Sequence, residues 1–163
     1  MTKKIARSGL LLSIALILSY IESLFPFFYG IPGMKLGLPN MAIVLTMYLF
    51  GNSEALIINI LRIIISGFLF GNLFGILFSI CGALISFLAM LIVKKIDLFS
   101  IYGVSVTGGV FHNIAQLFVA AFIVKTSGII YYMPFLILGG VITGFINGIV
   151  AGNTGIYLKK YLR

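Results

Sequence analysis

The chain has 163 residues, of which 61% are hydrophobic and only 9% are charged, and its mean hydropathy is +1.23. A soluble domain carries about a quarter charged residues and buries roughly two-thirds of the surface of its unfolded chain, so this composition excludes a water-soluble fold. The net charge of +8 does not indicate nucleic-acid binding, because the basic residues lie at the ends of apolar segments without interleaved stacking aromatics.

Six apolar segments predict an all-α polytopic transmembrane bundle of six helices, which forms a single integral membrane domain over residues 1–163. A spanning helix needs about 20 apolar residues, and hydrocarbon tolerates only helices or closed barrels. Long apolar runs without alternation favour helices. The segments are Gly9–Phe28, Leu38–Phe50, Ser53–Phe70, Leu73–Val93, Gly103–Val124 and Tyr132–Tyr157.

The first segment follows basic residues at the amino end, as the apolar stretch of a signal peptide does. Residues 19–23 contain no small-residue cleavage site, so we expect this segment to remain as the first span. Small residues at four-residue spacing let helices approach closely, and they predict a face of this segment on which a partner subunit docks. These residues are Gly9 with Ser13 and Ala15 with Ser19.

The loop Gly30–Asn40 combines glycines and prolines that exclude an ordinary helix. Irregular backbone near the membrane is tolerated where it lines a cavity or an aqueous space, so this loop is either a lid over a site or a tight connector. As a lid it would offer the cation of Lys35 and the amide of Asn40 to a bound polar group. Pro39 suits the first turn of the following helix.

The second and third segments are short for a bilayer, so a re-entrant pair from Leu36 to Phe70 is the alternative to two spans. Arg62 in the third segment is an ionisable residue at membrane depth, which costs roughly 2.5–3.5 kcal/mol on the insertion scale and marks a functional candidate. Asn59 and Ser66 share its helix face, so this face points into the bundle or into a water-filled cavity. There Arg62 contacts a substrate, or it pairs with Glu54 or with backbone carbonyls.

The fourth and fifth segments contribute a lone cysteine and a polar cluster. Cys81 excludes an internal disulfide and a cysteine metal cluster, and we expect it to serve in packing. His112, Asn113 and Gln116 form the cluster, with Gln116 one helical turn from both others. Three adjacent imidazole and amide groups predict a surface that lines an interior cavity.

The sixth segment carries glycines at four-residue spacing, which predict close helix packing within the bundle. Thr143 and Asn147 place polar groups beside this stripe. The stripe consists of Gly140, Gly144, Gly148 and Gly152.

Motifs for catalysis are missing from the sequence. The three acids, Glu22, Glu54 and Asp97, are scattered and form no Asp-rich magnesium motif. His112 has no second histidine at ligand spacing, and the chain has no P-loop. We therefore predict no catalytic residue, no cofactor and no metal site, and any ATP-driven work requires a partner.

Four stretches of the sequence resemble the Gx transporter family, many of whose members are labelled heptaprenyl diphosphate synthase component I. In size and span pattern this family is similar to the substrate-binding S components of energy-coupling factor vitamin transporters. The stretches are Gly33–Asn40, Leu61-Arg62, Leu69–Asn72 and Gly103–Gln116.

The resemblance implies a substrate site towards the outer side of a six-helix bundle, covered by the loop after the first helix. It further implies docking through the first helix on a coupling subunit driven by two ATPases, in the cytoplasmic membrane of a bacterium. Family members are also linked to quinone or polyprenyl synthesis and to flavin-linked electron transfer. Prenyl synthases use Asp-rich magnesium sites, which this chain lacks, so a role in that synthesis would be accessory.

Two functional hypotheses follow, and autonomous catalysis ranks below both. The first is a subunit that binds and transports a small anionic, zwitterionic or amphipathic solute and is energised by separate partners. The second is a membrane scaffold for polyprenyl synthase or redox partners. The residues predicted to bind the solute are Lys35, Asn40, Arg62, His112, Asn113 and Gln116.

The distribution of basic residues predicts that both chain ends face the cytoplasm, because basic loops are retained there. An amino end inside leaves only Lys35 and Lys125 outside among the loop residues. A reporter fused after Arg163 should therefore be active on the cytoplasmic side, as should one at the amino end. An extracytoplasmic carboxyl-terminal reporter beside a cytoplasmic amino-terminal one would contradict an even number of crossings. The predicted cytoplasmic residues are Lys3, Lys4, Arg7, Lys94, Lys95, Lys159, Lys160 and Arg163.

Overall fold

The computed structural model describes residues 2–24 and 36–162. Within these ranges the chain forms six α-helices and one short 3-10 turn, and it forms no strand, which confirms the all-α prediction. The end of the predicted first segment, residues 25–28, lies outside the described residues. The elements are α1 (Thr2–Leu24), α2 (Leu38–Leu49), α3 (Asn52–Phe70), α4 (Leu73–Ile96), α5 (Ile101–Val124), η1 (Ser127–Tyr132) and α6 (Met133–Leu162).

The surface of the bundle is apolar, as a bilayer requires. Five of the described helices are long and apolar enough to cross a membrane, and large apolar side chains such as Phe122 are exposed on them. Contiguous exposed apolar surface of this extent is rare on soluble proteins. Cys81 is exposed on α4, so its expected role in packing is wrong. It shares a helical face with exposed Leu77 and Leu88, and this face is turned towards lipid.

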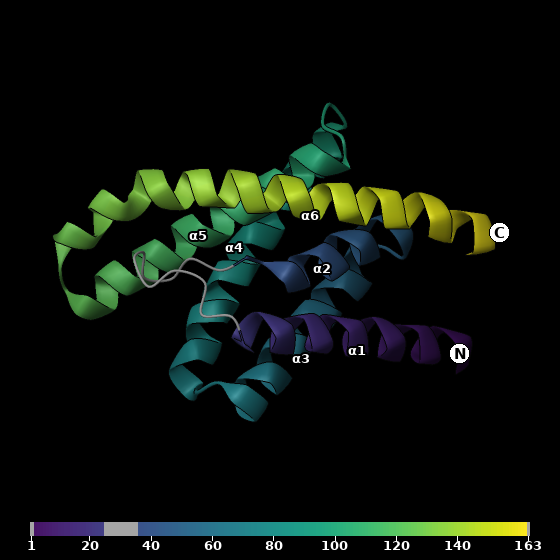
Figure 1. Ribbon diagram of the computed structural model, residues 1–163, viewed down its shortest axis with the longest axis horizontal. Coiled ribbons are helices and arrows are strands. Elements are labelled where there is room, and N and C mark those ends of the chain that lie inside the picture. Colours follow the sequence, from purple (N-terminus) through teal and green to yellow (C-terminus); the bar gives the residue numbers. More distant parts are fainter. Residues whose placement is uncertain (1, 25–35, 163) are drawn as a thin grey trace.

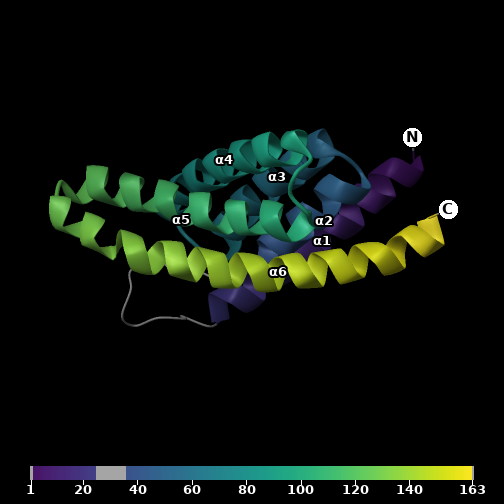
Figure 2. The same cartoon turned by 90° about the horizontal axis from the view of Figure 1, so that it is seen from above.

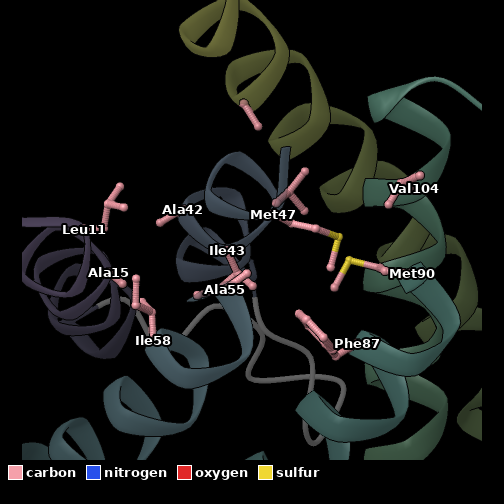
Figure 3. Close-up of a cluster of buried hydrophobic side chains, with 12 residues drawn as sticks. Leu11, Ala15, Ala42, Ile43, Met47, Ala55, Ile58, Phe87, Met90 and Val104 are labelled. Carbon is pink, nitrogen blue, oxygen red and sulfur yellow. The ribbon is translucent and has the colours of Figure 1, made fainter. Parts of the chain in front are cut away.

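The short helix α2 lies at the centre of the bundle. It contacts α1, α3, α5 and α6, and its residues Ile43 and Met47 are fully buried in the main apolar cluster (Figure 3). Twelve residues make a helix of only about 18 Å, whereas the hydrocarbon layer is about 30 Å thick. Helix α2 by itself is therefore too short to span the hydrocarbon layer, and it begins inside the bundle (Figure 1).

The α2–α3 turn lies at the end of the bundle that carries both chain termini (Figures 1 and 2). Glu54 in the first turn of α3 forms an ion pair with Arg7 of α1, with 2.9 Å between Oε2 and Nη2. On the other side of the turn, the Lys94 ammonium of α4 donates to the Met47 carbonyl at 2.7 Å and to Asn52 Oδ1 at 2.8 Å. These contacts place the turn level with the amino end, which favours six crossings over a re-entrant hairpin.

The pairing of Glu54 with Arg7 means that the alternative pairing of Glu54 with Arg62 is wrong. The two residues are eight positions apart on α3, which separates their backbones by about 12 Å along the helix axis. The Arg7 guanidinium also lies over the Phe50 ring, 3.9 Å from its centroid. In addition, a carboxylate in the first turn of a helix is favoured by the helix dipole. Glu54 therefore closes the end of the bundle and leaves Arg62 to its interior.

Helices α5 and α6 lie side by side along their length (Figure 2), and the glycine stripe of α6 faces α5. A Cβ atom at Gly140 would lie 2.8 Å from the Val110 Cα atom, and one at Gly144 would lie 2.7 Å from the Val106 Cα atom. A Cβ atom at Gly148 would lie 3.0 Å from the Tyr102 Cα atom, whereas Gly152 faces the side chains of Ile101 and Tyr102. Backbone therefore packs on backbone here, which is how transmembrane helices gain contact without a hydrophobic driving force.

The α5–α6 packing predicts that Gly140→Ala lowers the stability of the bundle by about 1–3 kcal/mol, because overpacking forces backbone shifts. Gly155→Ala on the same helix is the matched control, since a Cβ there meets only Leu45 Cδ1 at an ordinary 3.5 Å. Thermal unfolding of the purified variants in detergent measures the difference. Equal stability of the two variants would contradict the backbone contact.

Candidate functional site

A polar cavity lies inside the bundle, at the point where α2 begins. Its volume is about 40 Å³, which exceeds the space that one water needs, roughly 10–15 Å³. Side chains from all six described helices reach it, so sequence segments far apart contribute to one site. The lining residues are Glu22, Gly37, Pro39, Asn40, Arg62, Ser79, Ser105, Gly109, His112, Asn113, Thr143, Gly144 and Asn147.

The start of α2 forms one wall of the cavity. Gly37 has a φ of 68°, a left-handed conformation that glycine adopts without strain, and Pro39 occupies the first turn of the helix. The Gly37 N–H donates to Glu22 Oε1 of α1. The Asn147 amide of α6 donates to the Leu36 and Gly37 carbonyls, each at 3.1 Å. Two neighbouring helices therefore hold the amino end of α2 beside the cavity.

The position of this helix end influences the electrostatics of the site. The amino end of a helix carries a partial positive charge of about half an elementary charge. Asn147 lies near the middle of α6 and Arg62 near the middle of α3, so this end of α2 lies well inside the bundle. Discontinuous helices that end at such a depth direct their positive ends towards anionic groups of bound substrates in transporters.

Arg62 is the cationic side chain of the cavity. It is only 8% exposed, and its Nε and Nη2 atoms donate to Asn59 Oδ1 at 3.2 and 3.0 Å. Asn59 is its hydrogen-bond partner among the described residues, and this partner is a neutral amide on the same helix. A guanidinium has five N–H donors, so Arg62 retains donors that a ligand can engage.

Helix α5 supplies His112 and Asn113 to the cavity. The Asn113 amide donates to the Leu136 carbonyl of α6 at 2.9 Å, which fixes the side chain between the two helices. His112 lies against Gly82 of α4, where a Cβ atom would be 3.0 Å from the imidazole Cε1. A glycine at position 82 therefore makes room for the imidazole at the α4–α5 contact.

The structure brings four of the predicted binding residues to the cavity: Asn40, Arg62, His112 and Asn113. Lys35 lies outside the described residues. Gln116 is 2% exposed and packs against Gly82, beside the cavity and not in its lining. Within the described part of the chain its amide atoms have no hydrogen-bond partner.

Glu22 is a cavity residue that the sequence reasoning passed over. It is one of the three scattered acids, although it lies within the first predicted apolar segment, Gly9–Phe28. The rule that selected Arg62, that an intramembrane ionisable residue is a functional candidate, applies equally to Glu22. Ser79 and Ser105 also line the cavity, but a single serine in a transmembrane helix carries no comparable signal.

The small residues of α1 divide between two faces. A Cβ atom at Gly9 would have nothing within 4 Å, and Ser13 is likewise exposed. Ala15 and Ser19 are buried, at 0% and 9% exposure, because they face the core of the bundle. Of the four residues predicted to form the docking face, only Gly9 and Ser13 are therefore exposed to a partner.

The site is equipped to bind a polar group. It combines one cation, one carboxylate, an imidazole and several amides and hydroxyls. Among the described residues, no group of three or more His, Cys, Asp or Glu side chains is placed to hold a metal ion.

One comparison with known proteins identifies a family. The family model of heptaprenyl diphosphate synthase component I matches residues 11–154, whereas no curated protein and no solved structure gives a significant match. The family label that the sequence resemblance suggested is thereby confirmed, while the similarity to energy-coupling factor S components stays a prediction. Because the match extends from α1 to α6, the chain belongs to the heptaprenyl diphosphate synthase component I family.

Proposed function

We propose that this protein is a membrane-embedded subunit that binds and transports a small solute with an anionic group, and that separate partner subunits supply the energy. The observation that carries this proposal is the buried guanidinium of Arg62 in a polar cavity, hydrogen-bonded to a neutral amide. A charge at this depth is expensive unless it is paired or serves a path for ions or substrates. An anionic ligand offsets that cost.

The location of the cavity supports transport as the use of this binding. Secondary transporters place their sites near the middle of the bilayer, where unwound or interrupted helices meet. Here the short helix α2 begins beside the cavity, and the cavity is lined from all sides of the bundle.

Energy for transport has to come from elsewhere, because the sequence has no nucleotide-binding P-loop. We propose a coupling subunit with ATPases as the partners. The exposed small residues Gly9 and Ser13 on α1 give another transmembrane helix a place for close approach. We further propose the cytoplasmic membrane of a bacterium as the location, with the basic ends of α4 and α6 on the cytoplasmic side.

The family name favours a second candidate function. A component I of heptaprenyl diphosphate synthase implies another component of that enzyme, so this chain would be its non-catalytic membrane subunit. The same cavity would then hold the polar end of an amphipathic molecule. Activity of the polyprenyl synthase that survives deletion of this gene would argue against this candidate.

The ligand proposal predicts that Arg62→Gln loses a small molecule that the wild-type protein retains on gentle purification. Hydrogen bonds to a charged group contribute about 1.5–3 kcal/mol, so binding should weaken roughly 10- to 100-fold. Native mass spectrometry of the intact protein detects the bound mass. Arg7→Gln is the matched control, because it removes a guanidinium outside the cavity. A ligand retained equally by both variants, or absent from the wild type, would contradict the proposal.

The partner proposal predicts that the tagged full-length chain recovers a coupling subunit and ATPases from its native membrane, and that Gly9→Leu loses them. Leucine at position 9 is accommodated within the monomer, since its Cβ meets no neighbour, but it blocks close helix approach. Cys81→Leu enlarges an exposed residue on α4 and should retain the partners. Recovery of a prenyl synthase in place of ATPases would support the second candidate and overturn the first.

A further inference from the structure

Two opposite charges line the cavity without forming an ion pair. Glu22 of α1 and Arg62 of α3 both border it. Among the residues that the structure describes, no nitrogen of Arg62 lies within 4.0 Å of a carboxylate oxygen of Glu22, whereas Arg7 and Glu54 of the same two helices do form an ion pair. Arg7 and Glu54 therefore form a direct ion pair at the end of the bundle, whereas Glu22 and Arg62 remain separated in its interior.

Neither charged side chain of the cavity directly contacts an opposite charge among the described residues, although Glu22 and Arg62 attract each other across the cavity. The described hydrogen-bond partner of Glu22 is the Gly37 N–H, which engages Oε1, and a carboxylate has two oxygens with about four acceptor positions. The amino end of α2 adds a partial positive charge near Glu22, but this is less than a full cation. Within the described ranges, the hydrogen-bond partner of Arg62 is the Asn59 amide. Each group therefore keeps hydrogen-bonding capacity on the side of the cavity.

We propose that the ligand of this cavity is a zwitterion, whose anionic group binds Arg62 and whose cationic group binds Glu22. This inference rests on the proposed binding function and names its substrate class. A zwitterion places an opposite charge in direct contact with each side chain, and it adds no net charge to a cavity in which the charges of Glu22 and Arg62 already cancel. Charged groups in surroundings of low dielectric constant are stable only when they are paired and hydrogen-bonded.

The other classes of ligand each leave one charge unmatched. A simple anion pairs with Arg62 but meets the carboxylate of Glu22 in the same cavity, and a simple cation pairs with Glu22 but meets Arg62. An uncharged solute brings no counter-charge into direct contact with either side chain. Because the two side chains are further apart than an ion pair, the two charges of the ligand have to be separated by intervening atoms.

Binding of small probes to the purified full-length protein tests this inference. The probes are glycine, β-alanine and 4-aminobutyrate, which are zwitterions of increasing charge separation, together with propionate and propylamine. Isothermal titration calorimetry in detergent measures each Kd. At least one zwitterion should bind the wild-type protein tenfold or more tightly than propionate and propylamine do.

Charge-removing variants test the two roles separately. Glu22→Gln keeps an amide oxygen that accepts from the Gly37 N–H, and it should change the preference from the zwitterion to propionate. Arg62→Gln should change the preference to propylamine. Arg7→Gln and Glu54→Gln are matched controls on the same two helices, outside the cavity, and should keep the wild-type preference. A wild-type preference for propionate, or an unchanged preference in Glu22→Gln, would overturn the inference.

If no probe binds, native mass spectrometry of the wild-type protein tests for a larger natural ligand that stays bound during purification. A retained molecule with both a positive and a negative group supports the inference. A retained molecule with only negative charge, or with none, overturns the zwitterion while it leaves a binding function in place. If no probe binds and no molecule is retained, both the zwitterion inference and the proposed binding function are overturned.

Discussion

Hydrocarbon offers no hydrogen bonds, and this constraint organises the interior of the bundle. Hydroxyl side chains find a hydrogen-bond partner within their own helix. Ser19, Thr46 and Thr143 each donate to the carbonyl four residues earlier. Asparagine and charged side chains present more donors and acceptors than one helix can satisfy. Several of them are therefore drawn together between helices, and the cavity is where Arg62, Asn113 and Asn147 meet.

The short helix α2 follows from the same constraint. A helix that begins inside the bundle leaves its first N–H groups without partners, and the chain leading into it exposes further backbone groups. Glu22 and Asn147 provide partners for this stretch from α1 and α6. Glu22 and Asn147, which satisfy the start of α2, also line the cavity, so part of the site depends on the hydrogen bonds that hold this helix in place.

The sequence predicted where the helices begin and end better than it predicted which side of each helix faces the interior of the bundle. Turn signals such as Gly51-Asn52 and Gly71-Asn72 mark the ends of α3 within one residue, because glycine and asparagine act locally. The rotation of each helix depends on packing against its neighbours, which spacing along one helix does not reveal. For this reason Gln116 was expected in the cavity but packs against α4, and Ala15 was expected at the surface but lies in the core. Glu22 carries the same signal as Arg62, an ionisable side chain at membrane depth, but the sequence reasoning applied that rule to Arg62 alone.

The glycine contact between α5 and α6 means that one wall of the cavity is formed by packed backbone, whereas the opposite wall is formed by side chains. Gly109 and Gly144 border the cavity where the two backbones touch, so a larger side chain at either position would separate the helices. On the opposite side, Glu22 and Arg62 reach the cavity from α1 and α3 through long side chains, so an exchange there separates no pair of packed backbones, although Glu22 also accepts from the Gly37 N–H. A relative that evolves towards a different ligand is therefore expected to acquire its new specificity on α1 and α3, while the α5–α6 wall serves as the inherited framework.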